Sequence, residues 1–150
     1  MGKDWGGASM VPHLPCACAS LRRATRAVTQ LYDRELRGTG QRVTQFTLLE
    51  VLSRRDRITQ GRLGALLALD STTLSRTLRP LEAKGWIGAR RGKDRRERQW
   101  QLTPAGRRQL ERARPFWERA QKRLRERLGA AAFSALLSGL PAVTKAARSA

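Results

Sequence analysis

The segment from residue 59 to residue 106 constrains the fold more than any other part of the chain. Thr59 should cap a short apolar helix, which leads into a turn at residues 68–70. Asp70 or Ser71 should cap a second helix, which carries Leu74, Leu78 and Leu81 at i, i+4 and i+7. Because a helix turns by about 100° per residue, these leucines share one face. A basic hairpin pattern follows. This order predicts a winged helix-turn-helix, and the fold class we expect is mainly α with a small β-hairpin.

The side of the second helix opposite its leucines carries hydroxyls and guanidinium groups. Arginine can form bidentate bonds with guanine edges, and short hydroxyls can bond to bases or phosphates. The N-terminal end of such a helix usually contacts the bases. We therefore expect a surface that reads double-stranded DNA, with a solvated polar face as the alternative. The candidate contacts are Ser71, Thr72, Thr73, Ser75, Arg76 and Arg79. Pro80 should bend or locally break this helix.

The hairpin is predicted from two strand patterns, residues 86–90 and 98–102. Residues 90–98 include six basic and two acidic side chains. A narrow minor groove concentrates negative potential, and an arginine on a thin loop can enter it. The alternative is a charged hairpin that contacts only phosphates and carries no sequence information. The candidate contacts of this wing are Arg91, Lys93, Arg95 and Arg96.

The composition favours a polyanionic partner. The 150 residues include 31 lysines and arginines against 12 acidic residues, a formal net charge of +19. We find no phosphate-binding loop and no Ser/His/Asp set, so we expect no enzyme activity and no cofactor. The alternative function is an architectural DNA- or RNA-binding protein that uses its charge without sequence choice. No run of 18 apolar residues and no signal peptide is seen, so we expect a cytoplasmic protein without a membrane span.

Apolar stripes on both sides of the winged segment predict a homodimer. One helix should begin near Pro15, and its stripe comprises Cys18, Leu21, Ala24, Val28 and Leu31. A long helix should begin after the N-cap Thr103, kink at Pro115 and end at Gly129, before a last apolar helix. A winged domain can cover little of these stripes, so a second subunit should cover them.

The expected division of the chain has four parts. Residues 1–14 form a disordered N-terminal segment, 15–43 an N-terminal dimerisation helix, 44–103 the winged region, and 104–150 the C-terminal dimerisation helices. Within the winged region, Thr44 should cap a central apolar helix and Ile58 should form a very short strand beside the hairpin. We also expect Leu63, Leu66 and Leu67 to face inward.

Several short motifs follow one another in a specific order and spacing. These motifs are Thr44-Gln45-Phe46, Thr59-Gln60, Leu69-Asp70-Ser71-Thr72-Thr73-Leu74-Ser75-Arg76, Leu81-Glu82-Ala83-Lys84-Gly85-Trp86-Ile87, Asp94-Arg95-Arg96 and Leu102-Thr103-Pro104-Ala105-Gly106. Together they resemble the MarR (multiple antibiotic resistance regulator) family of transcriptional regulators. The resemblance implies a triangular homodimer that reads a pseudo-palindrome through adjacent major grooves. It implies that Arg95 and Arg96 enter the minor groove and that Asp94 supports the wing. Family members commonly repress a neighbouring operon, and small aromatic acids or thiol oxidation release them from DNA.

Four residues are candidates for sensing such a signal. Cys16 should lie in the first helical turn, where the helix dipole favours a thiolate. Cys18 lies on the apolar stripe, which favours a packing role, and the two cysteines face opposite ways on an intact helix. His13 with both cysteines offers three soft metal ligands, but no fourth is evident, so we expect no bound metal. Arg22 is a candidate for holding the carboxylate of an aromatic acid.

Overall fold

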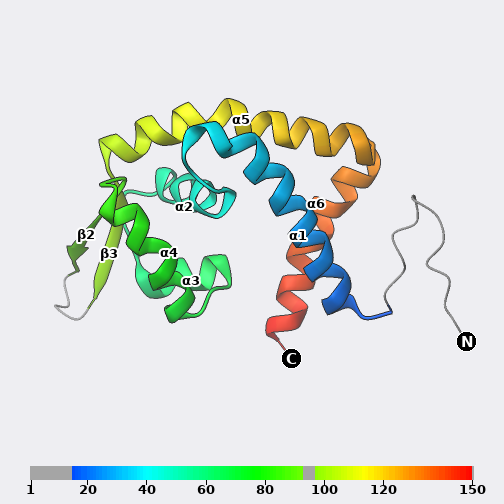
Figure 1. The fold of residues 1–150 in the computed structure, drawn as a ribbon. Helices are drawn as coiled ribbons and strands as arrows, with labels where there is room; N and C mark the ends of the chain where they lie inside the picture. Colours follow the sequence, from blue (N-terminus) through cyan, green and yellow to red (C-terminus); the bar gives the residue numbers. More distant parts are fainter. Residues whose placement is uncertain (1–14, 93–96, 150) are drawn as a thin grey trace, which may run out of the picture.

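The computed structural model of the chain describes residues 15–92 and 97–149 (Figure 1). Within these residues the chain is mainly helical, with one small antiparallel sheet. The elements in chain order are α1 (Ala17–Leu36), the 3₁₀ turn η1 (Arg37–Thr39), α2 (Val43–Ser53), β1 (Ile58–Thr59), α3 (Gln60–Leu67), α4 (Ser71–Ala83), β2 (Ile87–Arg91), β3 (Arg98–Leu102), α5 (Pro104–Leu128) and α6 (Ala130–Arg148).

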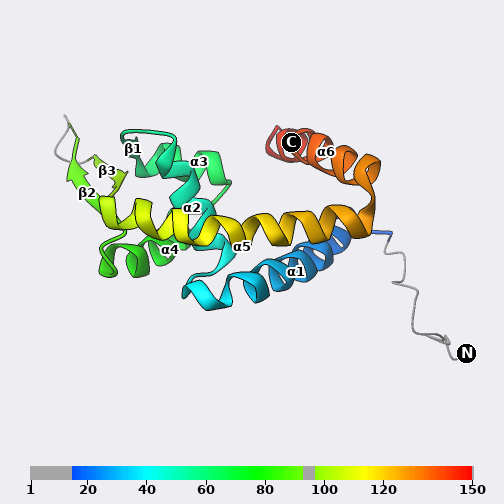
Figure 2. The same cartoon turned by 90° about the horizontal axis from the view of Figure 1, so that it is seen from above.

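The long helix α5 runs along one edge of the molecule and connects its two ends (Figure 1). The winged region, with α3, α4 and the hairpin, lies at one end. At the other end α6 folds back from the end of α5, and the view from above shows α1 and α6 on opposite sides of α5 (Figure 2). The strand order is β1-β3-β2, with Ile58 opposite Trp100 and Ile87 opposite Leu102. The predicted short strand at Ile58 is therefore confirmed.

The core lies in the winged region and beneath the first half of α5. Leu74, Leu78 and Leu81 are at most 1% exposed, which confirms the predicted inward face of α4. The rings of Phe46 from α2 and Trp117 from α5 stack with centroids 5.5 Å apart. The other buried apolar side chains of this cluster are Leu36, Leu48, Leu49, Leu52, Ile58, Leu63, Ile87, Trp100, Leu110 and Ala113.

Local capping signals place three helix starts where the sequence predicts them. The side chain of Thr59 accepts a hydrogen bond from the Arg62 N–H at 3.2 Å, and that of Thr103 accepts one from the Gly106 N–H at 3.0 Å. Asp70 caps α4. Gly129 separates α5 from α6. Its φ is 81°, a backbone conformation that glycine adopts without strain.

The starts of α1 and α2 differ from the predictions. The first helix begins at Ala17 with Cys16 as its N-cap, so Pro15 lies before the helix. Thr44 is not the cap of α2, because Arg42 occupies that position. The Asp33 carboxylate accepts the Val43 N–H at 2.8 Å, and so a side chain from α1 satisfies this helix end.

The inward faces of α1 and α3 are also partly different from the predictions. Leu66 is 49% exposed, since the short helix α3 buries only Leu63 and Gly64. In α1, Cys18 is exposed and Leu21 is 37% exposed, while Tyr32 and Leu36 are buried. Only the last turns of α1 reach the core of this subunit, so the predicted stripe faces outward along its N-terminal part.

The two prolines that were predicted to disturb their helices are accommodated without ending them. Pro80 lies within α4 and Pro115 within α5, and each helix continues past its proline. The first hairpin strand begins at Ile87, one residue later than predicted, and extends to Arg91. The second strand has the predicted bounds.

Candidate nucleic-acid interface

Helix α4 presents a polar face to solvent, opposite its three buried leucines. Every candidate contact predicted on this helix is exposed. They are Ser71, Thr72, Thr73, Ser75, Arg76 and Arg79. The N-terminal end of α4 lies at the edge of the molecule opposite α5, and the hairpin extends toward the same edge (Figure 1). One duplex can therefore contact the start of α4 and the hairpin together.

The N-cap Asp70 fixes the first turn of α4. Its carboxylate accepts the Thr73 N–H at 2.8 Å and also accepts the Thr73 hydroxyl. These two hydrogen bonds lower the pKa of Asp70, because they stabilise the ionised carboxylate. The Thr73 hydroxyl is thus occupied as a donor. In the described part of the chain, Arg76 and Arg79 have no hydrogen-bonded side-chain partner, so both guanidiniums can turn toward a ligand.

Gln60 connects α4 to the sheet, a role that we did not predict. Its side-chain nitrogen donates to the Ser75 hydroxyl at 3.0 Å, and its oxygen accepts the Trp100 indole N–H at 3.3 Å. The amide therefore joins α3, α4 and β3 and fixes the Ser75 side chain. The motif Thr59-Gln60 is visible in the sequence. The contacts of Gln60 were not predicted because its partners lie 15 and 40 residues away along the chain.

The base of the wing is anchored to the end of α4. The Arg98 guanidinium forms an ion pair with Glu82 at 2.7 Å and lies 4.4 Å from the centroid of the Trp100 ring. The Gly92 N–H donates to the Glu97 carbonyl oxygen at 2.8 Å and closes the described part of the hairpin. Arg91 is exposed beside this closure. Lys93, Asp94, Arg95 and Arg96, the other predicted residues of the wing, lie outside the described residues.

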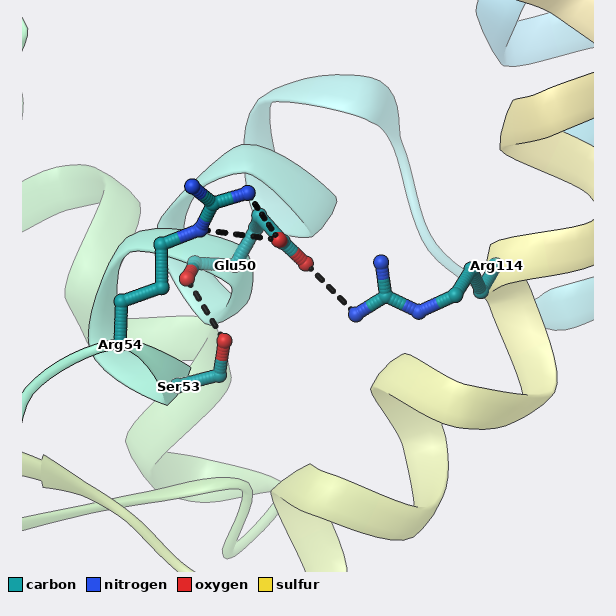
Figure 3. Close-up of polar contacts among 4 residues, drawn as sticks. All are labelled: Glu50, Ser53, Arg54 and Arg114. Atoms are coloured by element: carbon teal, nitrogen blue, oxygen red, sulfur yellow. Dashed lines mark hydrogen bonds and ion pairs between the residues drawn. The ribbon is translucent and has the colours of Figure 1, made fainter.

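An ion-pair bridge connects the winged region to α5 (Figure 3). The Glu50 carboxylate accepts hydrogen bonds from Arg54 at 2.9 Å and from Arg114 at 2.9 Å. Burial alone would raise the pKa of Glu50, but the hydrogen bonds and charges of these two arginines outweigh burial and lower it. Glu50 is therefore an anion that holds α2 against α5.

Three of the four predicted sensing residues lie at or near the start of α1. Cys16, Cys18 and Arg22 are exposed on α1 or at its start, and His13 lies outside the described residues. No group of three potential metal ligands occurs in residues 15–92 and 97–149. A cavity of about 360 Å³ lies elsewhere, between α2, α3 and α5. Its walls are formed by Phe46, Thr47, Glu50, Val51, Arg54, Arg55, Leu66 and Trp117.

The paired helices α3 and α4 with a basic hairpin define a winged helix-turn-helix protein, the class predicted from the sequence. The sequence model of the MarR family matches residues 42–97. The transcriptional regulator MosR of M. tuberculosis, solved in complex with DNA, is 33% identical and has a TM-score of 0.82, with 89% of this chain and 97% of that chain covered. The chain belongs to the MarR family, and it is a transcriptional regulator rather than an enzyme.

Two further relatives agree with this assignment. The transcriptional repressor CouR, bound to a 23-mer DNA duplex, is 27% identical with a TM-score of 0.78, and the match covers 86% of this chain and 92% of that chain. The uncharacterised HTH-type transcriptional regulator YwoH of Bacillus subtilis is 28% identical over 83 residues, which is 55% of this chain. The matched part spans 61% of the length of YwoH.

One observation on α6 bears on the sequence-based expectation about membranes. By length and composition alone, Ala130–Arg148 is apolar enough to cross a membrane, and none of that segment is buried in this subunit. The helix still carries Ser134, Ser138 and Lys145, so it contains no uninterrupted apolar run of that length.

Proposed function

We propose that this protein is a cytoplasmic repressor that binds a pseudo-palindromic operator in double-stranded DNA as a homodimer. The observation that carries this proposal is the exposed hydroxyl-and-arginine face of α4 above three leucines that are at most 1% exposed. The leucines fix the helix, and the polar face is left available for a major groove. Two relatives, MosR and CouR, were solved with DNA, which supports the same kind of partner here.

The side chains of this face differ in their availability and hence in their proposed roles. Arg76 and Arg79 carry the base contacts, since each can form a bidentate bond with a guanine. Ser71 and Thr72 contact phosphates or bases at the start of the helix, where the dipole favours an anion. The Thr73 and Ser75 hydroxyls are already hydrogen-bonded to Asp70 and Gln60, respectively. We therefore assign them two roles, to fix the shape of the surface and to contact DNA.

The wing supplies a second contact in this proposal. Arg91 with Lys93, Arg95 and Arg96 enters or borders the minor groove, and Asp94 supports the loop. The Arg98–Glu82 ion pair makes the base of the hairpin move with α4. The spacing between the two groove contacts is therefore set by the fold rather than by a flexible linker.

A homodimer accounts for the exposed apolar side chains of the helical end. The helix α6 has no buried residue in this subunit. Large apolar side chains that are more than one third exposed at this end are Leu21, Leu128, Leu136, Leu137, Leu140 and Val143. A second copy that covers them removes apolar area from water and places two winged regions on one duplex.

Release from DNA by a small ligand or by thiol oxidation completes the proposal. The cavity between α2, α3 and α5 has the aromatic walls Phe46 and Trp117, and the guanidinium groups of Arg54 and Arg55 also line it, a combination that suits a small aromatic acid. Occupation of this cavity would press on the Glu50 bridge between the winged region and α5. Cys16 and Cys18 are exposed and accessible to an oxidant.

The proposal is tested by selection of bound duplexes from a random-sequence DNA library. The wild-type protein should enrich one pseudo-palindromic sequence at fixed salt, and a variant with Arg76→Ala and Arg79→Ala should lose that enrichment. Binding with a steep salt dependence but no enriched sequence would instead support an architectural protein.

A further inference from the structure

Most of the positive charge lies outside the segment that holds β1, α3, α4 and the hairpin. Residues 58–102 contain ten basic and four acidic side chains. Residues 15–57 contain nine basic and four acidic side chains, and residues 103–150 contain eleven basic and three acidic ones. The groove-reading elements therefore account for less than half of the excess charge. The remainder lies on the helices that flank them and needs another explanation.

Five exposed arginines gather around the turn η1, where α1 ends beside α5. Three of them line a surface cavity of about 600 Å³, together with Gln30, Asp33 and the backbone turn at Gly40. A fourth, Arg112 of α5, reaches the carbonyl oxygen of Gly38 in η1 at 3.5 Å. Arg108 lies one helical turn earlier on the same face of α5. We name these residues the outer arginine patch: Arg34, Arg37, Arg42, Arg108 and Arg112.

The carboxylates near this patch are already engaged. Asp33 pairs with Arg42 at 3.4 Å and accepts the Val43 N–H at 2.8 Å. Glu35 pairs with two other arginines of α5 at 2.6 and 3.5 Å. Among the residues that the structure describes, Arg34, Arg37 and Arg108 have no carboxylate within ion-pair distance. Their charges are therefore available to an external anion.

The patch lies on the other side of the molecule from the proposed reading surface. The turn η1 and the first half of α5 form the edge opposite the start of α4 and the hairpin (Figure 1). A duplex that lies across α4 and the wing cannot also reach η1, because a DNA duplex is too stiff to bend around the molecule. An anion that binds the outer arginine patch must therefore belong to a different molecule or segment.

We propose that the outer arginine patch binds the phosphate backbone of a second segment of double-stranded DNA. Guanidinium groups match phosphate oxygens in a bidentate manner, and the cavity between Arg34, Arg37 and Arg42 can receive a phosphate. The patch and the residues lining its cavity include no aromatic ring, whereas proteins that hold single strands stack bases on aromatic side chains. A protein held on DNA also meets other DNA segments at high effective concentration.

The test first removes the two arginines of α4 that are proposed to contact bases. In the full-length protein with Arg76→Gln and Arg79→Gln, binding to a fluorescent duplex of random sequence is measured by anisotropy across a salt series. Adding R34Q, R37Q and R108Q should weaken the residual binding and reduce the salt slope by about 2–3, for three lost phosphate contacts, while the contacts of the wing remain. The matched control adds R26Q, R125Q and R127Q, three exposed arginines remote from η1, and should retain the residual binding.

Each outcome decides the proposal. Equal losses in the patch and control variants would show that only net charge matters, and no loss in the patch variant would show that the patch does not contact DNA. Tighter patch-dependent binding of a single-stranded RNA of equal length would assign the surface to RNA instead. Thermal unfolding of all variants confirms that they fold. The base-contacting arginines of α4 are absent from every variant, so the comparison does not depend on the proposed base recognition.

Discussion

Gly106 shows how one residue fixes the joint between the hairpin and α5. A Cβ atom at this position would overlap the backbone carbonyl of Trp86, and the side chain of Leu102 is also too close. The backbone of α5 therefore approaches the start of β2 more closely than any side chain permits. This close approach explains the glycine in the motif Leu102–Gly106.

Gly106→Ala should destabilise the fold by about 1–3 kcal/mol, because the backbone must shift to admit a methyl group. Urea unfolding followed by circular dichroism measures this change. Gly38→Ala is the matched control, since nothing lies within 4 Å of its Cβ position and its backbone is compatible with alanine. Equal stability of the two variants would contradict the close approach.

Asp70 makes the stability of α4 depend on pH. Its pKa in the folded protein lies below the ordinary value because the carboxylate accepts the hydroxyl and N–H of Thr73. The charge therefore stabilises the fold above the pKa of the unfolded state, and this contribution disappears as the pH falls through the lowered folded-state pKa. Asp70→Asn keeps an acceptor but has no charge, so it should be less stable than the wild type at neutral pH, and this difference should shrink in acid. Parallel urea titrations of both proteins from neutral to acidic pH measure the difference, and a difference that does not change with pH would be inconsistent with this mechanism.

At the scale of elements, the bridge at Glu50 is the main polar contact between α2 and α5. Glu50→Gln should remove the charge that Arg54 and Arg114 both contact, and it should destabilise the fold by about 1 kcal/mol. The effect is this small because solvent screens both arginines, which are partly exposed. Glu111→Gln, at an exposed position of α5, is the control and should be neutral. Identical unfolding midpoints would show that the bridge contributes nothing.

The elements also show which parts of the fold the sequence predicts and which it does not. The three leucines of α4 and the caps at Thr59, Asp70 and Thr103 are local signals, so they predict the winged region well. The Val43 N–H at the start of α2 is bonded by Asp33, ten residues away, and only the tertiary structure reveals this contact.

Exposure within one subunit is equally hard to predict. The periodicity of α1 and α3 correctly finds apolar positions, but it does not say which neighbour covers them. Leu21 and Leu66 therefore remain more than one third exposed in this subunit. For the candidate site, residue type and periodicity identify the exposed face of α4, whereas the link through Gln60 requires contacts between distant segments.

At the scale of the whole molecule, the exposed face of α6 predicts the oligomeric state. Leu137 is 50% exposed and lies among other exposed apolar side chains of α6. Leu137→Lys should shift the protein from dimer toward monomer, because a buried lysine charge is costly at an apolar interface. Ser138→Lys adds the same charge on the side of α6 that already carries Lys145, and it should leave the dimer intact. Sedimentation equilibrium separates these outcomes, and a dimer that is unaffected by Leu137→Lys would place the interface elsewhere.

The central claim is that α4 reads bases through its arginine face, and Arg76 tests it most directly. Affinities of the wild type, Arg76→Ala and the exposed control Arg127→Ala are measured on the selected operator and on a random duplex at one salt concentration. Arg76→Ala should lose about 1–3 kcal/mol of discrimination between the two duplexes, while the control keeps the wild-type ratio. An equal loss of affinity on both duplexes would show that Arg76 contacts only phosphate and would contradict base reading by this face.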